Sequence, residues 1–133
     1  MTPLTIDADT HPDVQLRIDS FTVPAAARAE FEAAMHRSAA LLETLPGFLG
    51  HLAFEKTSGS SAFNIVTIAV WQSREAMASA VSRVQAHYQS IGYNPRATAE
   101  RLGITAEIDN RYAPLAAAGT NVTKPAAIPS IAS

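Results

Sequence analysis

The residues able to do chemistry are few in this chain of 133 residues. It holds no cysteine and four histidines, which are His11, His36, His51 and His87. No two histidines have the close spacing of paired metal ligands, and thiolate ligands are excluded, so we expect no metal site. His87 is the leading acid–base candidate, because an imidazole with a pKa of about 6.5 can accept a proton near neutral pH. The alternative is a partly solvated histidine at the border of an apolar helical stripe.

Three further side chains are candidates for binding a substrate. Trp71 closes a predicted strand, where its ring could stack on a flat aromatic molecule or simply fill the core with its N–H bonded to a carbonyl. Tyr93 and Arg96 stand between a helix and the last strand, where Arg96 could hold a carboxylate or phenolate, or else lie on the surface. The remaining residues expected near a cavity, which can equally be ordinary core, are Phe31, Met35, Phe48, Leu52, Phe54, Thr67 and Met77.

Several classes of function lack their sequence signals. There is no Gly-x-Ser-x-Gly elbow, phosphate-binding loop or dinucleotide fingerprint, so no cofactor is predicted. The net charge of −2 argues against non-specific nucleic-acid binding. No apolar run approaches the ~20 residues of a membrane span, and acidic residues occupy the place of a signal peptide's basic region. We therefore expect a cytoplasmic protein.

The elements that must position these residues follow from hydrophobic periodicity. Residues 14–23 alternate and predict a strand, with Leu16 and Ile18 on one face and Arg17 and Asp19 on the other. A period of 3.6 predicts a helix over 25–45, stopped by a Pro-Gly pair.

The second half of the middle region repeats this alternation of elements. Residues 48–57 and 63–71 predict a hairpin around the TSGSS turn, with Phe48, Leu52 and Phe54 on one face of its first strand. Ser73 caps a helix that ends at Gly92, Asn94 and Pro95 start a short helix, and 105–112 is the last strand.

The resulting order, β-α-β-β-α-β, predicts a ferredoxin-like α+β fold with an antiparallel sheet and two helices on one face. Because the run NIVTIAV is apolar on both faces, we expect the open face to meet a second copy in a symmetric dimer. His51 is expected at that interface, and Arg17 and Asp19 could pair across it. His36 is expected to be solvated, and His11 carries no signal.

The domain is expected over residues 14–113. Residues 1–13 and 114–133 contain five of the eight prolines and predict two extended arms. At least one arm is expected to pack on the domain or on a partner subunit.

Two motifs carry a resemblance to a known family. Residues 45–50 (LPGFLG) and 70–77 (VWQSREAM) resemble the turn and helix start of the antibiotic biosynthesis monooxygenase (ABM) family. The resemblance implies a dimeric α+β barrel with an apolar cavity between helices and sheet in each subunit. Relatives oxidise anthrones to quinones with O2 and no cofactor, degrade haem, or isomerise or break down small molecules, and fold alone does not choose among these.

The family's known polar residues are mostly replaced here. The positions of the haem-degraders' Asn, Trp and His correspond to Ile18, Ala80 and Ser90, which makes haem degradation unexpected. The Asn and Tyr of the quinone-forming enzymes correspond to Thr67 and Met77, and Asn64 points to the other face from Trp71, so it is no simple substitute.

The leading hypothesis is a cofactor-independent monooxygenase acting with O2 on a small aromatic or polyketide-like substrate. His87 would be the base, Trp71 and the Phe residues would form the walls, and Tyr93 or Arg96 would orient the substrate. The alternatives are a non-catalytic binder or sensor, an isomerase or decyclase, and a structural dimer whose arms mediate protein contacts.

Overall fold

The computed structural model describes residues 5–7, 10–115 and 121–123. The central elements are β2 (Gln15–Thr22), a short 3-10 turn η1 (Ala25–Ala27) leading into α1 (Arg28–Leu42), β3 (Phe48–Glu55) and β4 (Ile65–Trp71). They are followed by α2 (Arg74–Ser90), α3 (Pro95–Leu102) and β5 (Thr105–Tyr112). Short strands β1 (Thr5–Asp7) and β6 (Asn121–Thr123) flank this core.

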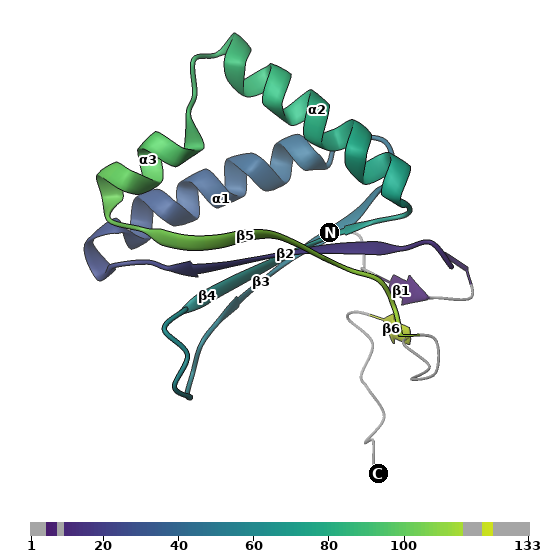
Figure 1. Ribbon diagram of the computed structural model, residues 1–133, viewed down its shortest axis with the longest axis horizontal. Helices are drawn as coiled ribbons and strands as arrows, with labels where there is room; N and C mark the ends of the chain where they lie inside the picture. Colours follow the sequence, from purple (N-terminus) through teal and green to yellow (C-terminus); the bar gives the residue numbers. More distant parts are fainter. Residues whose placement is uncertain (1–4, 8–9, 116–120, 124–133) are drawn as a thin grey trace.

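The four long strands form an antiparallel sheet in the order β3-β4-β2-β5. All three helices lie on one face of this sheet, and the C-terminal end of α2 stands away from it before α3 leads back to β5 (Figure 1). This arrangement confirms the predicted ferredoxin-like α+β fold.

The helix starts follow from local side-chain chemistry. The Ser73 hydroxyl accepts a hydrogen bond from the backbone N–H of Ala76 at 3.1 Å, and the Asn94 side chain accepts one from Ala97 at 3.1 Å. Each satisfies an N–H that has no partner within its helix. Both caps confirm the helix starts predicted from the sequence.

Gly47 explains why the turn before β3 carries a glycine. Its φ is +82°, and a β-carbon placed there would lie 2.5 Å from the Cβ of Ala76. Its carbonyl accepts a hydrogen bond from the N–H of Gln72 at 2.9 Å. Glycine therefore lets the turn approach the start of α2 closely, which sets the distance between that helix and the strand pair.

A β-bulge at the start of β3 changes which face its side chains occupy. Phe48 is opposite Trp71 but Gly50 is opposite Val70, so one extra residue shifts the alternation. Phe48 consequently lies on the helix side with Trp71, while Leu52, opposite Ile68, lies on the open face. The prediction that Phe48, Leu52 and Phe54 share one face was therefore wrong, because the extra residue at the bulge moves Leu52 and Phe54 to the face opposite Phe48.

The core is divided between the two faces of the sheet. Two clusters on the helix side centre on Phe31 with Ile65, and on Trp71 with Met77. A third cluster, built on Val14 and Val70, includes Leu16, Leu52 and Ile68. Since β4 contributes to clusters on both faces, both faces are apolar along this strand, as the sequence predicts.

The two arms meet each other. β1 and β6 pair antiparallel, with Ile6 opposite Val122, on the side of the sheet away from the helices (Figure 1). The remaining arm residues (1–4, 8–9, 116–120 and 124–133) lie outside the described part of the chain, so the domain limits and a contact with a partner stay predictions. Within the described residues, no helix has the length and hydropathy needed to cross a membrane.

Candidate functional site

A cavity of about 850 Å³ lies between the three helices and the sheet. This volume is within the range of small-molecule sites, about 300–1,000 Å³. Its walls are largely apolar, with Phe21 from β2, Met35 from α1, Val81 from α2 and Leu102 from α3 among the lining side chains. The cavity exists because the helices enclose a space over the middle of the sheet rather than packing onto it.

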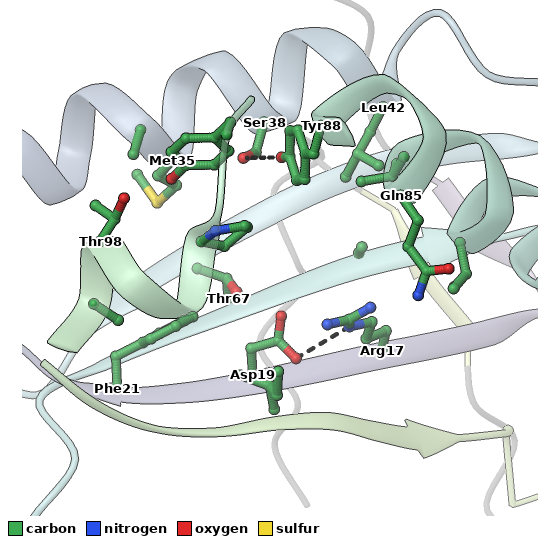
Figure 2. Close-up of a pocket in the computed structure, with 18 of the residues that line it drawn as sticks. Arg17, Asp19, Phe21, Met35, Ser38, Leu42, Thr67, Gln85, Tyr88 and Thr98 are labelled. Carbon is green, nitrogen blue, oxygen red and sulfur yellow. Dashed lines mark hydrogen bonds and ion pairs between the residues drawn. The ribbon is translucent and has the colours of Figure 1, made fainter. Parts of the chain in front are cut away.

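The cavity floor, which we define as Arg17, Asp19, His51, Thr67, Ala69 and Trp71, is polar at its centre (Figure 2). In the sheet register Ala69 of β4 is flanked by Arg17 of β2 on one side and by His51 of β3 on the other. Neighbouring strands are about 4.8 Å apart, so the Cα atoms of Arg17 and His51 are about 10 Å apart. The small alanine leaves open space between a cation and an imidazole.

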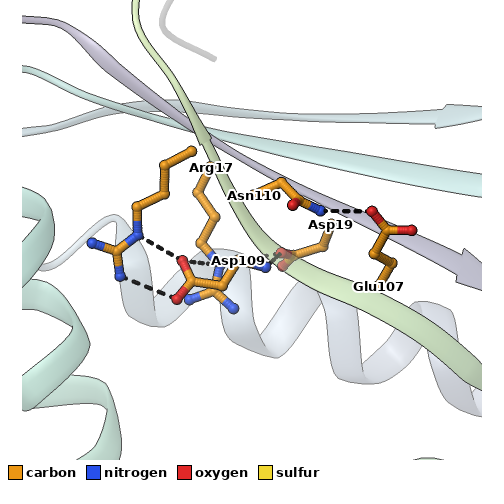
Figure 3. A network of polar contacts seen from close by, with 6 residues as sticks. Arg17, Asp19, Glu107, Asp109 and Asn110 are labelled. Atoms are coloured by element: carbon orange, nitrogen blue, oxygen red, sulfur yellow. Dashed lines mark hydrogen bonds and ion pairs between the residues drawn. The ribbon is translucent and has the colours of Figure 1, made fainter.

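Arg17 and Asp19 form an ion pair on this floor, with Nε of Arg17 3.2 Å from Oδ1 of Asp19. The same oxygen accepts a hydrogen bond from the backbone N–H of Asp109 at 2.7 Å. The pair belongs to a larger network that continues through Asp109 to Arg111, and a separate hydrogen bond joins Asn110 to Glu107 on the same strand (Figure 3). Contacts from a second strand therefore hold the charged part of the floor in place.

His51 is the histidine that faces the cavity. Burial lowers its pKa below the ordinary value of 6.5, with the charge of His36 acting in the same direction and the carboxylate of Asp19 opposing both. Because desolvation dominates, the imidazole is held in its neutral form near neutral pH. A neutral imidazole in an apolar cavity is suited to accept a proton.

The cavity roof, formed by Ser38, Tyr88 and Tyr93, brings together α1, α2 and the segment before α3. The hydroxyls of Ser38 and Tyr88 are 3.0 Å apart and hydrogen bonded (Figure 2). The rings of Tyr88 and Tyr93 meet edge to face, with their centroids 5.0 Å apart. These three residues also line a hollow of about 140 Å³ on the outer side, so they separate the cavity from that hollow.

Five of the residues predicted to bind substrate line this cavity in the structure. Phe31, Thr67, Trp71, Met77 and Tyr93 all contribute to its lining, and Trp71 is only 2% exposed.

Phe48 is not among the lining residues. Its ring packs edge to face against Trp71 at 5.2 Å and supports the tryptophan from behind. Of the other apolar candidates, Met35 lines the cavity, whereas Leu52 and Phe54 lie on the open face.

The structure places His87 and Arg96 outside the cavity. His87 lines the outer hollow, because Val81, Val84 and Tyr88 occupy the inward face of α2 and His87 is rotated away from them. Arg96 is 90% exposed and pairs with Glu100 along its own helix at 3.7 Å. Neither side chain reaches the cavity, so the location expected for His87 as the base and for Arg96 as a substrate-binding residue was wrong.

The structure assigns to the cavity three polar residues that sequence analysis placed at a subunit interface: Arg17, Asp19 and His51. The expected interface position of His51 was wrong, because its face of β3 is the one covered by the helices. The TSGSS turn offered a signal for the correct face of His51. A hairpin centred on Ser60 pairs His51 with Ala69, and Ala69 lies on the same face of its strand as Trp71.

A four-stranded antiparallel sheet with helices on one face, and a largely apolar cavity between them, defines a ferredoxin-like α+β protein. The family model for antibiotic biosynthesis monooxygenase matches residues 16–89. The chain belongs to this ABM family, as its two motifs predict.

Solved structures agree with this assignment. SnoaB, a cofactor-independent oxygenase from Streptomyces nogalater, is 26% identical with a TM-score of 0.54, covering 77% of this chain and 93% of its own. The haem-degrading MhuD of Mycobacterium tuberculosis is 22% identical with a TM-score of 0.57, covering 76% and 95%. A structure from Shewanella loihica PV-4 is 17% identical with a TM-score of 0.59, covering 77% and 95%. The last two show the fold alone. No curated protein is significantly similar to this chain.

Proposed function

We propose that this protein is a cofactor-independent monooxygenase that oxidises a small, flat, aromatic or polyketide-like molecule inside its cavity. The observation that carries the proposal is the floor, where His51 and Arg17 stand on either side of Ala69 beneath apolar walls. The resemblance to SnoaB, described as a cofactor-independent oxygenase, supports the same class of reaction. Cytoplasmic location and the absence of a cofactor stay predictions.

The chemistry requires a substrate with an acidic C–H group beside a carbonyl. Neutral His51 takes that proton, and the guanidinium of Arg17 stabilises the negative charge that moves onto the substrate oxygen. The carbanion gives one electron to O2, and the resulting carbon radical and superoxide combine into a peroxide anion. This anion takes a proton back from the His51 imidazolium to give a hydroperoxide. Loss of water from the hydroperoxide then converts the original CH2 to C=O, so that O2 supplies one oxygen to the product and one to water. The apolar walls shield the anion from water.

We propose His51 rather than His87 as the base, and Arg17 rather than Arg96 as the group that orients the substrate, because His51 and Arg17 line the cavity. Trp71, Met77 and Phe31 remain proposed wall residues, and Tyr93 a proposed roof contact. Haem degradation is not proposed, because Ala80 and Ser90 occupy the positions where its helical Trp and His are expected.

We propose further that the open face of the sheet joins two copies in a symmetric dimer. Its clustered apolar residues include Leu16, Leu52 and Ile68, and Phe54 on the same face is 51% exposed. Such a patch, left uncovered, is typical of an interface. The site itself lies on the opposite, helix-covered face of each copy.

Oxygen uptake by metal-free protein given an anthrone tests the proposed activity. We expect uptake above the spontaneous rate, and a fall of about 100-fold or more in His51→Gln, as for loss of a general base. His87→Gln is the matched control, because it removes an exposed imidazole from the same protein and should retain activity. Uptake no faster than the spontaneous rate across several anthrones, or loss of activity in the His87 variant with the His51 variant active, would contradict the proposal.

A non-catalytic binding or sensing role is the second candidate. It is favoured by Thr67 and Met77, which stand where the quinone-forming relatives are expected to carry Asn and Tyr. This role predicts that aromatic ligands raise the melting temperature through the ligand-linked stabilisation of the folded state, with no oxygen consumed.

A further inference from the structure

Strand β5 carries a bulge opposite the charged part of the cavity floor. On either side of it Ile18 pairs with Asn110 and Ser20 with Glu107, so two residues of β5 stand opposite Asp19 alone. One of these two is Asp109, with φ at +61°; among the described residues no other non-glycine residue has a positive φ. This left-handed conformation disfavours side chains in general, and Asp and Asn are among those that tolerate it best.

The bulge aims one backbone group at the site. In its left-handed conformation Asp109 donates its N–H to Oδ1 of Asp19 at 2.7 Å, and the same oxygen accepts from Nε of Arg17 at 3.2 Å. The guanidinium therefore uses Nε on Asp19, and its other four N–H groups have no recorded hydrogen bond within the described residues. Figure 2 shows this guanidinium on the floor of the cavity, between Asp19 and the amide of Gln85.

The geometry points to Asp109 as a positioning residue whose left-handed backbone holds Asp19, and through Asp19 the guanidinium of Arg17, at the cavity floor. In this arrangement the terminal N–H groups of Arg17 are available to an oxygen of the ligand. The consequence for a ligand rests on the proposed function, whereas the positioning itself does not.

The backbone, and not the carboxylate of Asp109, carries this role. The carboxylate binds Arg111 at 2.8 and 3.1 Å, and its distance to Nε of Arg17 is 3.8 Å, which is too long for a hydrogen bond. The side chains of Asp109 and Arg111 are 40% and 44% exposed, and ion pairs at such exposure contribute little. A short N–H bond to a carboxylate belongs to the strong, charge-assisted class.

Three substitutions of Asp109 separate backbone from charge. Asp109→Gly and Asp109→Asn both keep a residue that accepts positive φ and an N–H, while removing the negative charge. Asp109→Val also removes the charge, but its branched β-carbon disfavours the left-handed conformation. The proposal predicts that the first two behave as the native protein and that the valine variant does not.

The direct readout is the side-chain Nε–H signal of Arg17 in nitrogen–proton NMR spectra, assigned by its loss in Arg17→Met. We expect the signal to keep its position in the glycine and asparagine variants and to shift or vanish in the valine variant. Thr105→Val, an exposed position of the same strand, controls for valine in β5 as such. If circular dichroism shows that Asp109→Val is unfolded, Asp109→Ala supplies a milder version of the same backbone perturbation.

The second readout is the affinity for anthraquinone-2-carboxylate, followed by quenching of Trp71, the only tryptophan. This flat aromatic probe has no acidic C–H group beside its carbonyls, so the proposed reaction cannot consume it. We expect Arg17→Met and Asp109→Val to weaken binding by about tenfold or more, the loss of a hydrogen bond to a charged group. The glycine and asparagine variants should stay within about twofold. Equal disturbance in all three Asp109 variants, or an undisturbed valine variant, would overturn the inference. If the native protein does not bind the probe, that counts against the proposed function, and the NMR signal still decides the positioning role.

Discussion

Filling the space over Ala69 should make the protein more stable and less able to bind a substrate. Ala69 lies between Arg17 and His51 in the sheet register and lines the cavity. Ala69→Val adds two methyl groups to this open space without changing either functional side chain. Burying them contributes at most about 1.6 kcal/mol at about 0.8 kcal/mol per group. Valine also suits a strand, and the loss of side-chain freedom offsets part of the gain.

We expect a net stabilisation of about 1 kcal/mol, which for a domain of this size corresponds to about 3–5 °C in melting temperature. In a close-fitting pocket, a change of one methylene group alters recognition by about 10- to 200-fold. Ligand affinity and any oxygen uptake should therefore fall by at least about tenfold. Gaining stability while losing function is the pattern expected where a cavity is kept open for a ligand.

Urea unfolding measures the stability, and quenching of Trp71 with oxygen uptake measures the function. Ala53→Val is the matched control. Ala53 of β3 lies on the same face of the sheet as Ala69, but it is exposed and does not line the cavity. It should leave ligand affinity unchanged. Two results would refute the reasoning: a destabilised Ala69 variant, which would mean that no space is open there, or a stabilised variant with native affinity, which would place the ligand elsewhere.

Three further predictions concern the pH dependence of stability, a half-buried amide and the open face of the sheet. Because burial lowers the pKa of His51 in the folded protein, the unfolded chain binds the imidazole proton more tightly. The native protein should therefore lose stability relative to His51→Gln as the pH falls through 6.5 and below. Urea unfolding of both proteins at pH 7.5 and 5 tests this, and a stability difference that is constant or changes in the opposite direction would contradict it. Asn64 accepts from the N–H of Val23 and donates to its carbonyl, both at 2.9 Å; Asn64→Asp should cost about 1–3 kcal/mol, because an acceptor replaces the donor that faces this carbonyl, and an unchanged melting temperature would count against it. Leu52→Asp should convert the proposed dimer to a monomer in light scattering while the far-ultraviolet circular dichroism stays native; a dimer that survives would exclude this face as the interface.

The fold was accessible from the sequence because its signals are local. Ser73, Asn94 and Pro95 mark helix starts through hydrogen bonds within a few residues, and Gly47 marks a turn that no other residue would fit so closely. Alternation and helical period then placed the long strands and helices near their observed limits. These features depend on neighbours in the chain, which a single sequence shows directly.

The site was less accessible because it depends on which sheet face the helices cover. Alternation separates Leu16 and Ile18 from Arg17 and Asp19, but it does not say which set lies under the helices. Apolar residues were expected there, whereas the cavity under the helices allows this face of the sheet to carry an ion pair.

The histidine assignment failed for related reasons. The bulge at the start of β3 shifts the pattern by one residue just before His51, and bulges lack a strong sequence signal. His87 lies one residue before Tyr88, which is on the inward face of α2. A shift of one residue in a helix rotates a side chain by about 100°, so the imidazole of His87 lies outside the cavity.

The pairing of β1 with β6 has a consequence for how the chain folds. Thr5 lies opposite Thr123, so this three-residue contact closes a loop that contains nearly the entire chain. The entropy of closing so long a loop is recovered only when the intervening domain has already brought the two ends together. The contact should form after the domain in folding and open before it in hydrogen exchange, with amide protection below that of β2 and β4. Amide protection in β1 and β6 should therefore indicate whether the domain between these two strands is folded.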